Sequence, residues 1–124
     1  MPLTEVFYYQ ESDGSVPVIA WLDELKRRDM KAFEKCTAVI ERLEEVGHEL
    51  RRPTADVLRD GIYELRARKQ HVNYRILYFF HGKNVAILAH AMTKEDIVSV
   101  ADLNRALARK RLFEADPDSH TFKE

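Results

Sequence analysis

Three consecutive β-prone runs in the second half of the chain constrain its fold more than any other feature of the sequence. Residues 62–68, 72–80 and 84–92 alternate side chains between two faces and are rich in β-branched and aromatic residues, which is typical of strands. The segment HGKN contains Gly82 and Asn84, two residue types that tolerate the positive φ of a tight hairpin turn. These runs therefore predict a small antiparallel sheet.

The rest of the chain predicts one further strand and three helices. Residues 4–9 form a short β-prone run, and apolar residues at helical spacing predict two antiparallel helices within residues 18–46. A last helix over residues 100–114 begins with Ser99 and Asp102, which resemble a capping box. The expected order is β-α-α-β-β-β-α. This is an α+β fold in which a small, mostly antiparallel sheet has helices on one face and solvent on the other.

Length and composition indicate a single domain over residues 1–124. The last ten residues, ADPDSHTFKE, are so polar that we expect a tail at 115–124 without regular structure, and no role is predicted for His120. Cys36 is the single cysteine and the five histidines are scattered, so neither a disulfide nor a metal site is expected. The sequence predicts no signal peptide, membrane span or cofactor, which favours a cytoplasmic protein.

Positive charge is concentrated in one part of the chain. The formal net charge is −1, but residues 61–94 carry six lysines and arginines against one acidic residue, Glu64. That segment therefore has a local charge of +5, and the remainder of the chain carries −6. A basic surface on an otherwise acidic protein favours a polyanionic partner at that surface.

Strand alternation predicts where these cations point. Glu64, Arg66 and Arg68 share one face of their strand, and Arg75 lies on the next strand. One interpretation is that the arginines lie on a solvated face and pair with Glu64 or with carboxylates of the helices, each pair contributing about 0–1 kcal/mol to stability. The other is a strip of guanidinium groups that binds phosphate through two-pronged hydrogen bonds. The pattern alone leaves DNA, RNA and an acidic protein as possible partners.

The same alternation makes a prediction for the third strand of the sheet. It groups His90 and Met92 with Leu88 on one face of that strand. His90 is then a candidate for proton transfer, because an unperturbed imidazole has a pKa of about 6.5. A structural histidine packed among these apolar neighbours is the alternative.

The segments GIYELRARKQHVNYRILYFFHGKNVAILAHAMTKED and SVADLNRALARKRLFE resemble the HigB-like, phage-derived branch of the RelE/ParE toxin superfamily. The pattern Gly-hydrophobic-Tyr-Glu-Leu-Arg, followed by Tyr-Arg-hydrophobic-hydrophobic-Tyr-Phe, is matched by residues 61–66 and 74–80. The resemblance covers about residues 4–114. One departure is Thr93-Lys94-Glu95, which keeps a single lysine where the family commonly has a Lys-Lys pair.

This resemblance implies the toxin of a type II toxin–antitoxin system that cleaves mRNA on the ribosome. The reaction would need no metal or cofactor, because the 2′-OH of the RNA itself serves as nucleophile. The implied partners are the ribosome, mRNA and a cognate antitoxin with a helix-turn-helix domain, which would carry any contact with operator DNA. Two alternatives remain: a non-enzymatic gyrase inhibitor like ParE, which would rely on its paired helices, and a degenerate toxin that only binds its antitoxin.

The implied reaction assigns candidate roles to eight residues. Arg66 and Arg75 would stabilise the charge that builds on the phosphate, and His90 would transfer a proton. Lys94 would add electrostatic stabilisation. The residues expected to bind RNA outside the reaction centre are Arg68, Lys69, His71 and Tyr74, the last by stacking on a base.

Overall fold

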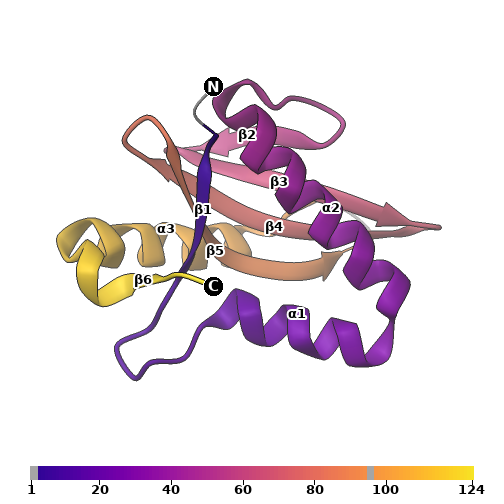
Figure 1. Cartoon of the computed structure of the whole chain (residues 1–124), viewed down its shortest axis with the longest axis horizontal. Coiled ribbons are helices and arrows are strands. Elements are labelled where there is room, and N and C mark those ends of the chain that lie inside the picture. The colour runs from indigo at the N-terminus through magenta and orange to yellow at the C-terminus, as the bar shows by residue number, and fades with distance from the viewer. Residues whose placement is uncertain (1–2, 95–96) are drawn as a thin grey trace.

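The computed structural model describes residues 3–94 and 97–124. Figure 1 shows a sheet flanked by helices, with the chain ends β1 and β6 lying side by side. The helices are α1 (Pro17–Arg28), α2 (Met30–Val46) and α3 (Val100–Ala115), and two short 3-10 helices cover Gly47–Glu49 and Pro117–His120. The strands are β1 (Glu5–Tyr9), β2 (Ala55–Arg59), β3 (Ile62–Lys69), β4 (Val72–His81), β5 (Val85–Lys94) and β6 (Thr121–Phe122).

The six strands form one sheet in the order β2-β3-β4-β5-β1-β6. β1 runs parallel to β5, and every other neighbouring pair is antiparallel. The prediction of an α+β fold with a mostly antiparallel sheet is confirmed. The predicted element order is only roughly right, because it lacks β2 and β6. Both are short strands at the sheet edges, where one side has no neighbouring strand and the apolar pattern is weak.

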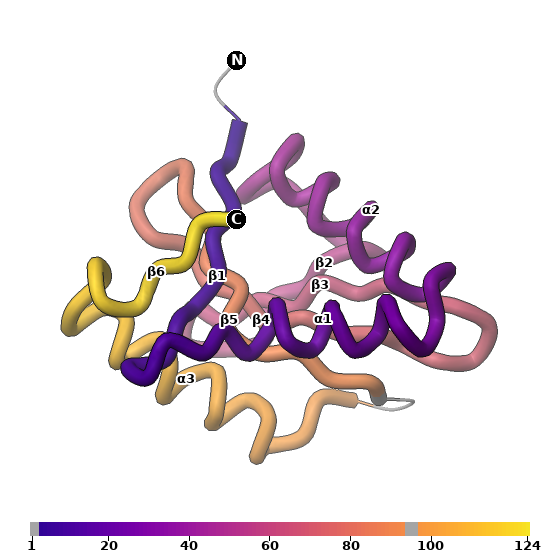
Figure 2. The backbone as a smooth tube through the Cα atoms, turned by 60° about the horizontal axis from the view of Figure 1, so that its bottom comes forward, coloured from indigo at the N-terminus to yellow at the C-terminus, as the bar shows by residue number. Residues whose placement is uncertain are grey.

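Helices cover both faces of the sheet, so the prediction of one solvent-facing side is wrong. The helices α1 and α2 pack on one face, and α3 packs on the other (Figure 2). β4 explains this arrangement, since Ile76 and Tyr78 are buried on the first face while Leu77 and Phe79 are buried on the second. A strand buried on both faces has a continuous apolar run and not an alternating one, as in the segment ILYFF.

A β-bulge shifts the alternation of β5. Leu77 of β4 lies opposite His90, but Tyr78 lies opposite Leu88, so Ala89 is the extra residue. Beyond this point the side chains of β5 change face. His90 and Met92 consequently lie on the α3 face, opposite to Leu88, and the prediction that these three share a face is wrong.

Residues 115–124 do not form the polar tail that their composition predicts. They form a 3-10 helix followed by β6, which pairs with β1. His120 is only 6% exposed, and its ring stacks on Tyr9 with centroids 5.2 Å apart. Its Nδ1 lies 2.7 Å from the carbonyl oxygen of Gln10. A few specific contacts thus order a segment that is mostly polar.

Asp29 fixes the corner between α1 and α2. Its carboxylate accepts a hydrogen bond from the backbone N–H of Ala32, which caps the N-terminus of α2. The same carboxylate accepts from Lys69 Nζ at 2.6 Å, which ties this corner to the end of β3. In the described part of the chain, no helix is long and apolar enough to span a bilayer.

The contacts of His120 predict that its replacement destabilises the fold. His120→Ala removes the stacking on Tyr9 and leaves the Gln10 carbonyl without this partner, so the free energy of unfolding should fall by about 1–3 kcal/mol. Urea denaturation followed by circular dichroism measures the change. Asp118→Ala, at an exposed position in the same turn, is the control. Its free energy of unfolding should fall by less than about 0.5 kcal/mol. Equal stability of the two variants would contradict the packing of this segment.

Candidate functional site

A pocket of about 380 Å3 lies where β3 and β4 meet the segment that leads into β2. It is lined by residues from two strands and one connection: Pro53, Thr54, Arg66, Arg68, Asn73 and Arg75. Arg66 lies opposite Arg75 in the β3–β4 ladder, and Arg68 lies opposite Asn73. Strand pairing therefore brings three guanidinium groups, separated in sequence by up to nine residues, to one place on the α3 face of the sheet. We refer to these six residues as the arginine pocket.

Glu64 is buried next to the pocket and binds two of these arginines. One of its carboxylate oxygens accepts a hydrogen bond from Arg66 Nη2 at 2.8 Å, and the other accepts from Arg75 Nη1. Glu64 is 2% exposed and Arg75 7%, so neither belongs to a solvated surface pair. The first interpretation of the cations is therefore right that Arg66 and Arg75 pair with Glu64, but wrong that such pairs are solvated. A buried pair broken on one side leaves an uncompensated charge, which typically costs about 3–5 kcal/mol.

Arg68 and Asn73 form the outer part of the arginine pocket. Arg68 is exposed, and its Nε donates to the carbonyl oxygen of Gln70 at 2.9 Å in the β3–β4 turn. The backbone of Asn73 lies opposite that of Lys94 at the end of β5. The side chain of Lys94 and residues 95 and 96 lie outside what the structure describes, so the prediction for Lys94 and for the Thr93-Lys94-Glu95 departure stays a prediction.

Three of the expected RNA-binding residues lie away from the arginine pocket. Lys69 faces the α1–α2 side of the sheet, where it pairs with Asp29. Tyr74 is 7% exposed and packs edge-on against Trp21 with ring centroids 6.4 Å apart, so the expectation that it stacks on a base does not fit its position. Neighbouring residues of a strand point to opposite faces, which separates both from Arg68 and Arg75. His71 is exposed in the β3–β4 turn and does not line the pocket.

His90 connects β5 to α3 through both of its ring nitrogens. Nε2 lies 2.8 Å from Asp102 Oδ1, and Nδ1 lies 3.3 Å from Arg109 Nη1. Because a guanidinium can only donate, Nδ1 must be the acceptor, and the proton is on Nε2. Arg109 Nη1 also donates to the carbonyl oxygen of Ala89, the bulged residue, at 2.8 Å. Engagement of both nitrogens within the protein is typical of a structural histidine.

The pKa of His90 is lowered from its usual value. Burial has the largest effect and disfavours the charged imidazolium. The hydrogen bond with Asp102 raises the pKa, while the charge of Arg109 lowers it further. Burial dominates, so His90 is neutral at physiological pH.

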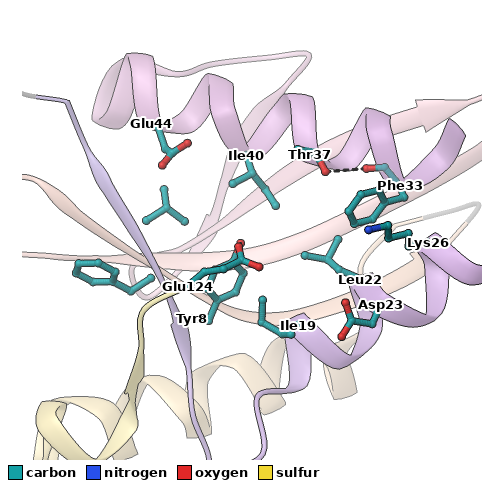
Figure 3. A pocket seen from close by; sticks show the side chains of 12 residues that line it. Tyr8, Ile19, Leu22, Asp23, Lys26, Phe33, Thr37, Ile40, Glu44 and Glu124 are labelled. Carbon is teal, nitrogen blue, oxygen red and sulfur yellow. Dashed lines mark hydrogen bonds between the residues drawn. The ribbon is translucent and has the colours of Figure 1, made fainter. Parts of the chain in front are cut away.

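A second pocket, between the first two helices, has the opposite charge. Figure 3 shows this cavity of about 410 Å3 between α1 and α2, beside β1. Its carboxylates come from Asp23, Glu44 and Glu124, against a single cation, Lys26. Burial and the neighbouring glutamates on α2 raise the pKa of Glu44. A polyanion would be repelled here, in contrast to the arginine pocket.

Sequence alternation could identify Arg66, Arg68 and Arg75 but not the other residues around them. Pro53 and Thr54 reach the pocket only because β2 pairs with β3, and β2 has little sequence signal. Asp102 was visible only as part of a helix cap, and its contact with His90 depends on the position of α3. Within residues 3–94 and 97–124, no three His, Cys, Asp or Glu side chains are arranged to hold a metal ion.

The structure is that of a small α+β protein that gathers three arginines in one pocket on its sheet. A family model described as "Phage derived protein Gp49-like (DUF891)" matches residues 20–112. The chain therefore belongs to this Gp49-like family, which is a toxin-like family related to RelE/ParE. A search of curated proteins finds no match.

The environment of His90 predicts a pH dependence of stability. In the unfolded chain His90 has a pKa of about 6.5, and in the folded protein its pKa is lower. Between these values the unfolded state binds more protons, so stability falls as the pH drops through about 6.5 and the loss is complete below the folded pKa. Urea denaturation at several pH values, for the wild type and His90→Gln, isolates this contribution. The variant should lose less stability between pH 7.5 and 5. Equal losses, or an NMR titration of His90 at or above its usual pKa, would contradict the assignment.

Proposed function

We propose that this protein is the toxin of a type II toxin–antitoxin system, of the HigB-like branch, and that it cleaves mRNA on the ribosome. The observation that carries this proposal is the arginine pocket, in which three guanidinium groups line one cavity on the sheet. Membership of a toxin-like family supports it. Guanidinium groups suit phosphate because their planar donors match two of its oxygens at once.

The proposed reaction needs no group beyond RNA and protein. The 2′-hydroxyl of the RNA gives up its proton to a base as its oxygen forms a bond to the adjacent phosphorus. The bond from phosphorus to the 5′-oxygen breaks, and that oxygen takes up a proton. Arg66 and Arg75 bind the phosphate oxygens on which negative charge builds, while Arg68 and His71 contact flanking phosphates. Lys94 adds positive charge from the end of β5. His90 can exchange a proton with RNA only after Arg109 has left Nδ1 or Asp102 has left Nε2.

The proposed partners follow from the same surface. A cognate antitoxin with a helix-turn-helix domain would cover the arginine pocket with an acidic segment and so prevent contact with RNA. Operator DNA would be bound through the antitoxin alone. The protein would act in the cytoplasm, where ribosomes and mRNA are.

A second candidate function is supported by the geometry of His90. A degenerate toxin would only bind its antitoxin and would not cleave RNA, and engagement of both His90 nitrogens within the protein favours this alternative. The pocket would then serve binding only. Measurements of RNA cleavage and of RNA binding on the same preparation separate the two functions.

Expression without the antitoxin should stop translation before replication. Pulse labelling with a radioactive amino acid and with thymidine follows the two processes after induction, and northern blots follow mRNA. We expect amino acid incorporation to fail first and mRNA to be shortened. Early loss of thymidine incorporation with intact mRNA would instead indicate a gyrase inhibitor, as for the ParE side of the superfamily.

Replacement of the pocket arginines should lower the cleavage rate. Arg66→Ala should reduce single-turnover cleavage of ribosome-bound mRNA about 10²–10³-fold, the scale for one oriented donor. Arg66→Lys should recover only part of this loss, because an ammonium cannot form the two-pronged contact. Arg75→Ala should reduce cleavage similarly but also destabilise the fold, since Arg75 is buried against Glu64.

Thermal melting of each variant separates these two effects. Arg52→Ala is a suitable control, because Arg52 is an exposed arginine that pairs with Asp56 and does not line the pocket. It should cleave at close to the wild-type rate. Normal cleavage by a folded Arg66→Ala variant would show that this arginine is structural.

A further inference from the structure

Glu64 contacts two arginines of the arginine pocket but does not itself face the cavity. It does not line the pocket and is almost completely inaccessible to solvent. A carboxylate in this position cannot touch a bound phosphate or exchange a proton with it. Apart from the through-space effect of its charge, any influence on a ligand must pass through the two arginines that it contacts.

The β3–β4 ladder brings two positive charges together, and Glu64 compensates them. Arg66 and Arg75 lie directly opposite each other on one face, and like charges in this relation repel. The two oxygens of Glu64 each bind one of them, so a single carboxylate contacts both guanidinium groups. Within the described residues, Arg66 Nε is buried without a hydrogen-bond partner, which leaves the contact with Glu64 to orient this side chain.

The charge of Glu64 and its alignment of the arginines have opposite expected effects on a ligand. A negative charge behind a phosphate site weakens the attraction for RNA, so binding by charge alone would improve if Glu64 were neutral. Alignment of the donors has the opposite consequence. A phosphate gains most from two guanidinium groups when both are already held in the bound geometry.

We propose that Glu64 is a positioning residue, which holds Arg66 and Arg75 at the separation that one RNA phosphate requires. This inference rests on the proposed function and specifies how its pocket is organised. It predicts that loss of the negative charge weakens RNA binding, although the protein becomes more positive by one charge.

The test is equilibrium binding of a fluorescein-labelled single-stranded RNA, measured by anisotropy over a series of salt concentrations. Glu64→Gln should weaken binding about tenfold or more, the scale of one lost charge-assisted hydrogen bond. The slope of log K against log salt should fall by about 0.7, the value for one phosphate contact to a single strand. A merely electrostatic role gives tighter binding and no loss of slope.

Glu34→Gln provides the matched control. Glu34 is exposed on α2, so this variant changes the net charge by the same amount without touching the arginine pocket. Thermal melting establishes that each variant is folded. If Glu64→Gln does not fold, Glu64→Asp replaces it, because aspartate keeps the charge and withdraws the carboxylate by one methylene. Because Glu64→Asp leaves the net charge unchanged, its control is the wild type, and we expect it to bind RNA more weakly than the wild type.

Failure of this inference can be told apart from failure of the proposed function. If the wild type binds RNA and a folded Glu64→Gln binds as tightly as Glu34→Gln, or a folded Glu64→Asp as tightly as the wild type, the positioning role is overturned and the RNA site stands. If the wild type does not bind RNA, the proposed function and the inference both fall. NMR titration with inorganic phosphate adds a local readout, since the Nε–H signals of Arg66 and Arg75 should shift together in the wild type and not in Glu64→Gln.

Discussion

The contact of one buried carboxylate with two arginines determines how this sheet can present positive charge. A guanidinium group on a strand that is covered on both faces would ordinarily be excluded from the interior. Glu64 makes Arg75 tolerable there and holds Arg66 at the border between interior and solvent. The packed core under α3 can therefore continue directly into a charged pocket on the same face, without a mobile loop between them.

Helices pack on both faces of the sheet that carries the arginine pocket. α1 and α2 fix the reverse side of β3 and β4, and Asp29 reaches from their corner to the end of β3. On the other side, α3 is joined to β5 through His90, Asp102 and Arg109. The acidic cavity between α1 and α2 lies on the opposite face from the arginines, so the protein has a distinct charge on each side of its sheet.

Much of the fold could be predicted because strand and helix periodicities are strong in this sequence. The three central strands and three helices follow from local patterns, whereas β2 and β6 depend on partners distant in sequence. The apolar run ILYFF indicates a strand that is buried on both faces. The arginines and the glutamate nearby indicate a solvated face instead, and they led to the wrong prediction. Here the tertiary pairing of charges decided the burial of Glu64 and Arg75, and such pairing has no period in the sequence.

The site was predictable to the extent that it depends on strand alternation. Alternation alone brings Arg66 and Arg68 together and places Lys69 on the other face. It fails for His90, because a single extra residue in β5 reverses which side chains face α3. A bulge is a property of two paired strands, so one strand's sequence cannot reveal it.

The position of β1 has a consequence for the order in which this protein can fold. β3, β4 and β5 are joined by short turns and can pair soon after they are made, since local contacts form fastest. β1 is synthesised first, yet it lies between β5 and β6, and its two neighbours come from the second half of the chain and from its last residues. During synthesis β1 therefore has no strand to pair with until β5 has been made. The sheet is completed only when Phe122 has left the ribosome.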